Sequence, residues 1–100
     1  MAVSVNIPTP FRRATRDRAR VDLEAADVRA LLDTLEGRFE GLRGLVRDAG
    51  GAILHHVNVY VNGEEVGDLQ GQATVLQAGD EVSIIPALAG GAPALRGRWS

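Results

Sequence analysis

The segment that most constrains the fold is "VNVYVNGEEV", residues 57–66. Its three valines alternate with more polar residues, and this period of two is typical of a strand with one buried face. Asn62-Gly63 follows immediately, and this dipeptide favours a type I′ turn between two antiparallel strands. The chain must therefore contain a sheet that hides one face, and the rest of the sequence has to supply its cover.

Two more strands are predicted near the amino end. "AVSVNIP" places Val3, Val5 and Ile7 on one face, and the prolines at 8 and 10 end the strand. After an arginine-rich turn, "RVDL" places Val21 and Leu23 on one face. These two segments are predicted to form a hairpin.

The last predicted strand lies in "GDEVSIIPAL". We expect Val82, Ile84 and Ile85 to be buried, and Pro86 to stop the ladder because proline has no N–H to donate.

One helix separates the two groups of strands. In "DVRALLDTLEGRF" the apolar residues recur with the spacing of a single helix face, at Val28, Leu31, Leu32, Leu35 and Phe39. Asp27 is the predicted N-cap, since its carboxylate can accept the free N–H groups of the first turn. The glycine-rich stretch that follows predicts a short second helical turn at Leu42 to Val46 and then a loop.

The predicted order is β-β-α-β-β-β, an α+β class. Two hairpins joined by one main crossover helix form a mixed sheet in which the last strand lies beside the first. This is the β-grasp, or ubiquitin-like, arrangement. It directs the residues after Ile85 off the end of a central strand.

Composition excludes several functional classes. The 100 residues contain no cysteine, which removes disulfides, thiolate nucleophiles and cysteine-based metal sites. No apolar run approaches the ~20 residues that span a bilayer, and "MAVSVNIPTPFRR" lacks the pattern of an export signal. The sequence therefore predicts a soluble cytoplasmic protein with no membrane partner.

Charge argues against nucleic acid. All 11 basic residues are arginine, and residues 1–91 hold nine of them against 13 acidic residues, a net charge of −4. "RRATRDRAR" is a local exception, with arginines at 12, 13, 16, 18 and 20. We interpret it as a solvated loop and strand face, and the alternative is a docking patch for an acidic partner. No aromatic residues interleave with these arginines, as a nucleic-acid platform would require.

The sequence contains no catalytic pattern. A Ser-His-Asp spacing and a GxGxxG motif are absent, and a P-loop would need a lysine that the chain lacks. His55 and His56 are expected at the start of a strand, with side chains on opposite faces that cannot share a metal. Glu64 and Glu65, beside the predicted turn, are interpreted as solubilising residues. No catalytic residue, metal site or bound cofactor is predicted.

The carboxyl end carries a family resemblance. "GDEVSIIPALAGG" resembles the end of the MoaD/ThiS sulfur-carrier proteins, which finish in a strand, a proline and then Gly-Gly, and the resemblance runs from "VSVNIPTPFR" through "VNVYVNGEEV" to Gly91. The "IPALAGG" ending is most similar to the carriers of cysteine biosynthesis, and next to the small subunit of molybdopterin synthase. A second Gly-Gly pair, Gly50-Gly51, occurs in the middle of the chain, so the dipeptide alone is weak evidence for the family.

The resemblance implies a reaction at Gly91. An E1-like partner enzyme would adenylate its carboxylate with ATP, and a sulfur donor would convert the acyl-adenylate to a thiocarboxylate. Gly90 and Gly91 suit a narrow channel because they have no side chain. Pro86, Leu88 and Ala89 are predicted to contact the partner with them. The implied partners are an E1-like adenylyltransferase or sulfurtransferase and an acceptor such as a cysteine synthase or the molybdopterin synthase large subunit.

The extension "APALRGRWS", residues 92–100, blocks this chemistry, because an amide at Gly91 cannot be adenylated. We expect residues 1–91 to be the carrier domain, and the extension to be removed by a zinc metalloprotease such as the resemblance implies. The alternative is that it stays attached and packs Trp99 or Leu95 against the sheet of a binding module. The rival function is that of a ubiquitin-like modifier, which would transfer Gly91 to lysines of target proteins.

Overall fold

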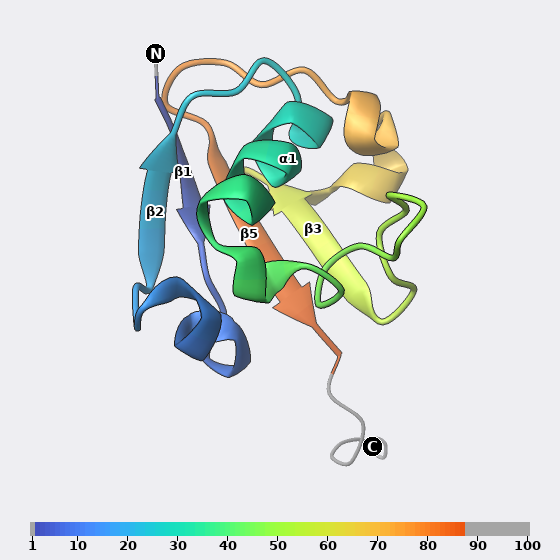
Figure 1. Cartoon of the computed structure of the whole chain (residues 1–100). Coiled ribbons are helices and arrows are strands. Elements are labelled where there is room, and N and C mark those ends of the chain that lie inside the picture. Colours follow the sequence, from blue (N-terminus) through green and yellow to red (C-terminus); the bar gives the residue numbers. More distant parts are fainter. Residues whose placement is uncertain (1, 88–100) are drawn as a thin grey trace, which may run out of the picture.

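The computed structural model describes residues 2–87 (Figure 1). In this part of the chain, one mixed sheet has the strand order β2-β1-β5-β3-β4. Its strands are β1 (Val3–Asn6), β2 (Arg20–Leu23), β3 (Val57–Val61), β4 (Glu64–Glu65) and β5 (Glu81–Pro86). The predicted β-β-α-β-β-β order is confirmed, and the last strand lies beside the first in the middle of the sheet.

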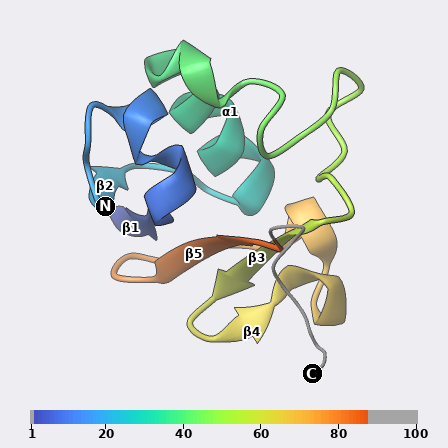
Figure 2. The ribbon, with the colours of Figure 1, turned by 90° about the horizontal axis from the view of Figure 1, so that it is seen from below.

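The helix α1 (Val28–Arg38) crosses one face of the sheet, as Figure 2 shows from below. Its buried residues are Val28, Leu31, Leu32 and Leu35, the predicted stripe. The predicted N-cap is also confirmed, since the Ala30 N–H donates to Asp27 Oδ1 at 2.8 Å. Within residues 2–87, no helix has the length and apolar character needed to cross a membrane.

The core lies between α1 and the sheet. The alternating residues of the three central strands point into it, and their exposed fractions are 6% or less: Val3, Val5, Val57, Val59, Val61, Val82 and Ile84. Ile85 is 49% exposed, so the prediction that it is buried is wrong. Because Val82 and Ile84 point inward, the period of two places Ile85 on the opposite face.

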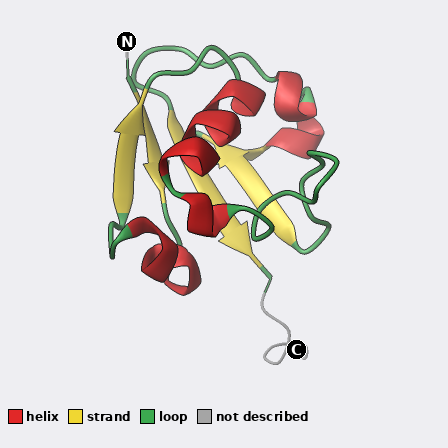
Figure 3. Cartoon of the chain, viewed as in Figure 1, coloured by secondary structure: helices red, strands yellow, loops and turns green. Residues whose placement is uncertain are grey.

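Short 3₁₀ helices connect the main elements (Figure 3). The predicted arginine-rich turn contains η1 (Thr9–Thr15), which buries Phe11 and Thr15. The predicted helical turn at Leu42 to Val46 occurs earlier in the chain, as η2 (Glu40–Leu42). Gly44 has a φ of +85°, a left-handed conformation that ends helical structure before Val46. Two further turns, η3 (Val66–Asp68) and η4 (Gly71–Ala73), follow β4.

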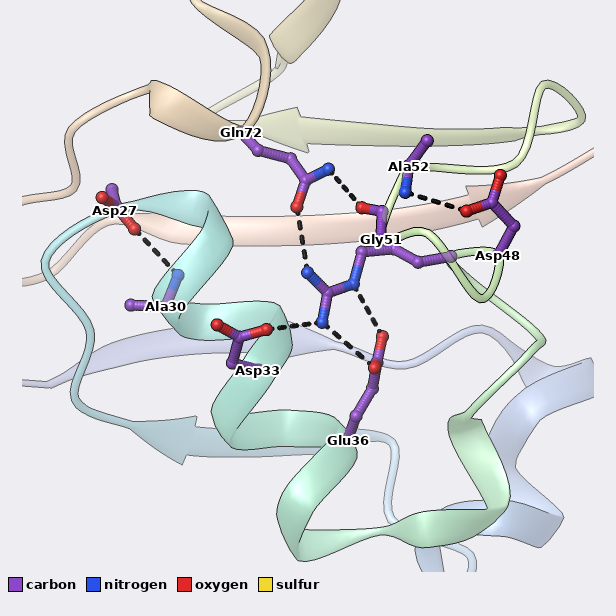
Figure 4. Close-up of polar contacts among 9 residues, drawn as sticks. Asp27, Ala30, Asp33, Glu36, Asp48, Gly51, Ala52 and Gln72 are labelled. Carbon is purple, nitrogen blue, oxygen red and sulfur yellow. Dashed lines mark hydrogen bonds and ion pairs between the residues drawn. The ribbon is translucent and has the colours of Figure 1, made fainter.

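A polar network holds the loop between η2 and β3 (Figure 4). The side chain of Arg47 is 8% exposed, and its guanidinium donates to Asp33 at 2.7 Å and to Gln72 at 3.1 Å. Gln72 in turn donates to the Gly51 carbonyl at 2.7 Å. These bonds join the loop to both α1 and η4, and the charged guanidinium is buried with acceptors for its donors.

Candidate functional site

The candidate site begins where β5 ends, because β5 carries the predicted tail. β5 lies between β1, with which it runs parallel, and β3, with which it runs antiparallel. Val82 and Ile84 fix it to the core, at 0% and 2% exposure. The Ala87 N–H then donates to the His56 carbonyl at 2.6 Å. The root of the tail is therefore held by hydrogen bonds up to Ala87.

Pro86 is accommodated at the end of this central strand without the loss of a ladder bond. The Ala87 N–H donates to the His56 carbonyl at one end of the β3–β5 ladder, and the Asn62 N–H donates to the Glu81 carbonyl at the other end. Between these two pairs, the residue pairs of the antiparallel ladder alternate between hydrogen-bonded and non-hydrogen-bonded. Pro86 pairs with Val57, which falls between two such pairs. The Val57 N–H donates instead to the Leu54 carbonyl at 2.9 Å. The half-buried proline thus limits the ladder without leaving an unpaired donor.

The predicted tail residues Leu88, Ala89, Gly90 and Gly91, and the extension 92–100, lie outside the described residues. The predictions for these positions stay predictions.

The sheet face opposite α1 carries Ile85 next to the tail root. Asn58 pairs with Ile85 in the register and therefore shares this face, as does half-buried Tyr60. Farther along, Asn6 donates to Ser83 Oγ at 3.1 Å across β1 and β5. An exposed isoleucine on an otherwise polar face, close to the tail, marks a candidate contact surface. Sequence reasoning missed Ile85 as a surface residue, although alternation from Val82 could have identified it.

The five clustered arginines divide into two groups. Two have partners within the described chain: Arg12 Nε donates to the Ile7 carbonyl at 3.1 Å, and Arg20 lies 3.3 Å from Asp22. The other three are exposed, at positions 13, 16 and 18. The interpretation as a solvated loop and strand face describes their exposure, but η1 gives the loop a defined helical structure.

The histidine pair differs from its prediction. His55 and His56 lie in a turn before β3, so the prediction that they begin a strand is wrong, and the opposite-face argument that depended on it does not apply. Their rings pack edge to face, with centroids 5.5 Å apart. Among residues 2–87, no group of three His, Asp or Glu side chains is placed to hold a metal ion.

The turn before β4 has the predicted geometry. Asn62 and Gly63 have φ values of 51° and 88°, as a type I′ turn requires. Asp80 supports the turn by accepting from Gln77 N–H at 2.8 Å and from Asn62 Nδ2 at 3.0 Å. These bonds, first from Gln77 and then from Asn62, lower the pKa of Asp80 because they favour the carboxylate. Glu64 and Glu65 form β4, beside the turn as predicted.

Comparison with known proteins identifies the family. The ThiS family model matches residues 5–91, from β1 through the predicted Gly-Gly. The chain belongs to the ThiS family. The predicted MoaD/ThiS membership and the β-grasp fold are both confirmed, and the match covers the full length of the predicted carrier domain apart from its first four residues.

The curated relatives of this ThiS-family chain include carriers and a modifier. It is 37% identical to the sulfur carrier protein CysO of Mycobacterium tuberculosis over 93 residues, which are 91% of this chain and 100% of CysO. It is 48% identical to small archaeal modifier protein 3 of Haloferax volcanii over 73 residues, 72% of this chain and 76% of the relative.

A solved structure of a complex supports the same fold. The ThiS-family chain is similar to a chain in the crystal structure of the Amycolatopsis orientalis BexX/CysO complex, with a TM-score of 0.82 and 34% identity. The similarity covers 89% of this chain and 99% of the other. That carrier-type protein has therefore been observed with a partner protein.

Proposed function

We propose that the chain is a sulfur carrier whose working group is the carboxylate of Gly91. The main support is the ThiS family match, which runs through Gly91, on a fold whose central strand holds the tail root at Ala87. A rigid root next to a partner surface lets binding of the folded domain position a short tail in a partner's active site. The carrier itself supplies no catalytic group.

The chemistry belongs to an E1-like partner. The Gly91 carboxylate attacks the α-phosphorus of ATP, and pyrophosphate leaves. The sulfur of a hydrosulfide or persulfide donor then attacks the acyl-adenylate and AMP leaves, which produces a thiocarboxylate once any persulfide bond has been reduced by a thiol. ATP is therefore a substrate of the partner and not a cofactor of this chain.

Residues 92–100 must first be removed, because Gly91 has no free carboxylate while they are attached. We assign this cleavage to a zinc metalloprotease acting after Gly91. The thiocarboxylate then donates sulfur in the cytoplasm to an acceptor enzyme of cysteine biosynthesis, in keeping with the similarity to CysO. Molybdopterin synthase is the alternative acceptor.

Protein modification is the second candidate function, and the 48% identity to small archaeal modifier protein 3 favours it. In that case activated Gly91 would form an isopeptide bond with a target lysine. The chain has no lysine of its own, so it could not build lysine-linked chains on itself.

The test compares a chain ending at Gly91 with the 100-residue chain, each incubated with the cognate E1-like enzyme, ATP and sulfide. Intact-mass spectrometry should show that the shorter chain exchanges one oxygen for sulfur and that the longer chain is unchanged. Sulfur at Ser100, or no exchange with an enzyme shown to be active, would contradict the proposal. A ladder of isopeptide-linked products from cell proteins would favour the modifier.

A further inference from the structure

Three arginines form an exposed patch that the fold does not use. The arginine patch consists of Arg13, Arg16 and Arg18, all exposed. Arg13 lies on η1, and Arg16 and Arg18 lie in the turn that follows. No hydrogen bond or ion pair joins their guanidinium groups to any other residue of the described chain. Asp17 is the acidic residue between them.

The backbone holds this patch in place. Arg16 and Asp17 have φ values of 57° and 63°, and the Arg16 N–H caps η1 by donating to the Arg12 carbonyl. Thr15, which is fully buried, uses its hydroxyl to contact the carbonyls of Arg12 and Arg18 at 3.2 and 3.1 Å. The arginine side chains therefore project from an ordered turn.

The sheet topology places the patch at the same end of the domain as the tail. β1 and β5 are neighbours and run parallel, with Asn6 paired to Ser83. η1 follows β1 and the tail root follows β5, so both leave the sheet at the same edge, as Figure 1 shows. The arginine patch and Ala87 thus lie at the same end of the domain.

We propose that the arginine patch is a second contact surface for the enzyme that activates the tail, and that it meets a carboxylate-rich surface beside that enzyme's tail channel. This inference rests on the proposed sulfur-carrier function. Residues 1–91 carry a net charge of −4, so the exposed arginines are a local region of positive charge on a negative domain. The electric field of an acidic partner would therefore orient the domain with the arginine patch toward the partner. Guanidinium groups also bind carboxylates with two parallel hydrogen bonds.

A protein partner fits the patch better than nucleic acid does. The patch holds no aromatic side chain on which a base could stack, since Phe11 is 7% exposed. The negative charge of the rest of the domain would repel a phosphate backbone. A patch at the margin of an interface acts mainly on the association rate.

The experiment measures the association rate between the Gly91-ended chain and its purified adenylating enzyme at several salt concentrations. The variants are Arg13→Glu and Arg18→Glu, because Arg16 has a left-handed backbone conformation that complicates its replacement. Arg29→Glu is the matched control. It makes the same change of charge at an exposed arginine in the first turn of α1, at the opposite end of the domain (Figure 1). Thermal melts establish that each variant folds, and Arg13→Gln and Arg18→Gln provide milder substitutions.

We expect each patch reversal to slow association about three- to tenfold at low salt, and Arg29→Glu to have a much smaller effect. The difference should largely vanish near ~0.5 M salt, where the Debye length falls to about 4 Å. The glutamine variants should change the rate in the same direction and by less.

If charge reversal at Arg13, Arg18 and Arg29 slows association equally, or does not change the association rate at any of them, the proposed role of the arginine patch is wrong. The proposed sulfur-carrier function would not be affected by that result. A parent chain that neither binds the enzyme nor gains sulfur would refute the function itself, and the patch proposal with it. A single-stranded oligonucleotide is the remaining probe. If the patch reversals weaken oligonucleotide binding and spare the enzyme, the patch binds nucleic acid and the proposal is wrong.

Discussion

Arg47, in the loop between η2 and β3, makes a bidentate ion pair with Glu36 of α1. Arg47 Nε lies 2.9 Å from Glu36 Oε2, and Nη2 lies 3.0 Å from Oε1. The hydrogen bond to Glu36 is the largest influence that raises the pKa of Arg47, and it outweighs the lowering by burial. Asp33 adds a further bond, but its side chain is 62% exposed whereas that of Glu36 is 16% exposed.

The two carboxylates should therefore contribute unequally to stability. Glu36→Ala should lower the free energy of unfolding by about 1.5–3 kcal/mol, because it leaves a buried guanidinium short of acceptors. Asp33→Ala should lower it by about 1 kcal/mol or less, as for an exposed pair. Urea denaturation of both variants measures the difference. Equal decreases in the free energy of unfolding would show that the bidentate pair with Glu36 stabilises the fold no more than the exposed pair with Asp33 does.

The helix should depend strongly on its buried stripe. Leu32 is fully buried, and Leu32→Ala should lower the free energy of unfolding by about 2–5 kcal/mol. Leu45 is 37% exposed, so Leu45→Ala is the matched control and should cost less than about 1 kcal/mol. If the two variants melt together, the packing of α1 on the sheet is misassigned.

Acid should weaken the turn that Asp80 supports. The folded-state pKa of Asp80 lies below its unfolded value, which is close to 3.9, so its contribution is present above that pH and is lost as the pH falls through the folded pKa. Parent and Asp80→Asn should therefore differ most in unfolding free energy near neutral pH and converge as the pH falls below the folded-state pKa of Asp80. Asp68→Asn, which removes one carboxylate from an exposed residue of η3, is the matched control. A difference between parent and Asp80→Asn that stays the same at every pH would contradict the prediction.

Ile85 should matter for partner binding and little for folding. Ile85→Asp should weaken binding to the activating enzyme about tenfold or more and change the free energy of unfolding by no more than about 0.5 kcal/mol. Val75→Asp is the control, because Val75 is 68% exposed and precedes β5, at the end of the sheet away from the tail. Leu88→Asp should behave like Ile85→Asp. If the Ile85 and Leu88 variants lose unfolding free energy together with affinity for the enzyme, these residues contribute to the core and not to a contact surface.

Gly91 should tolerate no side chain in the activation reaction. In the chain that ends at this residue, Gly91→Val should abolish the gain of sulfur, because a β-branched side chain hinders a narrow channel. Its melting curve should match the parent, since β5 ends at Pro86. Intact-mass spectrometry and circular dichroism provide the two readouts, and normal sulfur transfer by Gly91→Val would contradict the predicted role of the glycine pair.

Local patterns were enough to predict most of the fold. The alternation in β1, β3 and β5, the stripe of α1 and the Asn62-Gly63 turn each depend on neighbours in the sequence, so their signals lie within short windows. The error at Ile85 arose where two isoleucines precede a proline, because hydrophobicity and alternation make opposite predictions there. The structure follows the alternation, because Ile84 points into the core and Ile85, the next residue, therefore points to the opposite face of the sheet.

The interactions of Arg47 could not be predicted in this way. Its acceptors lie at positions 33, 36 and 72, and nothing in the loop sequence distinguishes it from the exposed arginines nearby. The location of the arginine patch required one further step. The cluster was visible in the sequence, but its position beside the tail follows from the parallel pairing of β1 with β5.

The position of β5 between β1 and β3 also affects how the domain responds to mechanical force. A partner that bound the predicted tail and pulled on it would load β5 along its length, and both neighbours of β5 are hydrogen-bonded strands. A pull along the strand loads these bonds together, in shear, whereas a pull at right angles would break them one at a time. The described domain should therefore keep its fold when a partner pulls on the chain beyond Ala87.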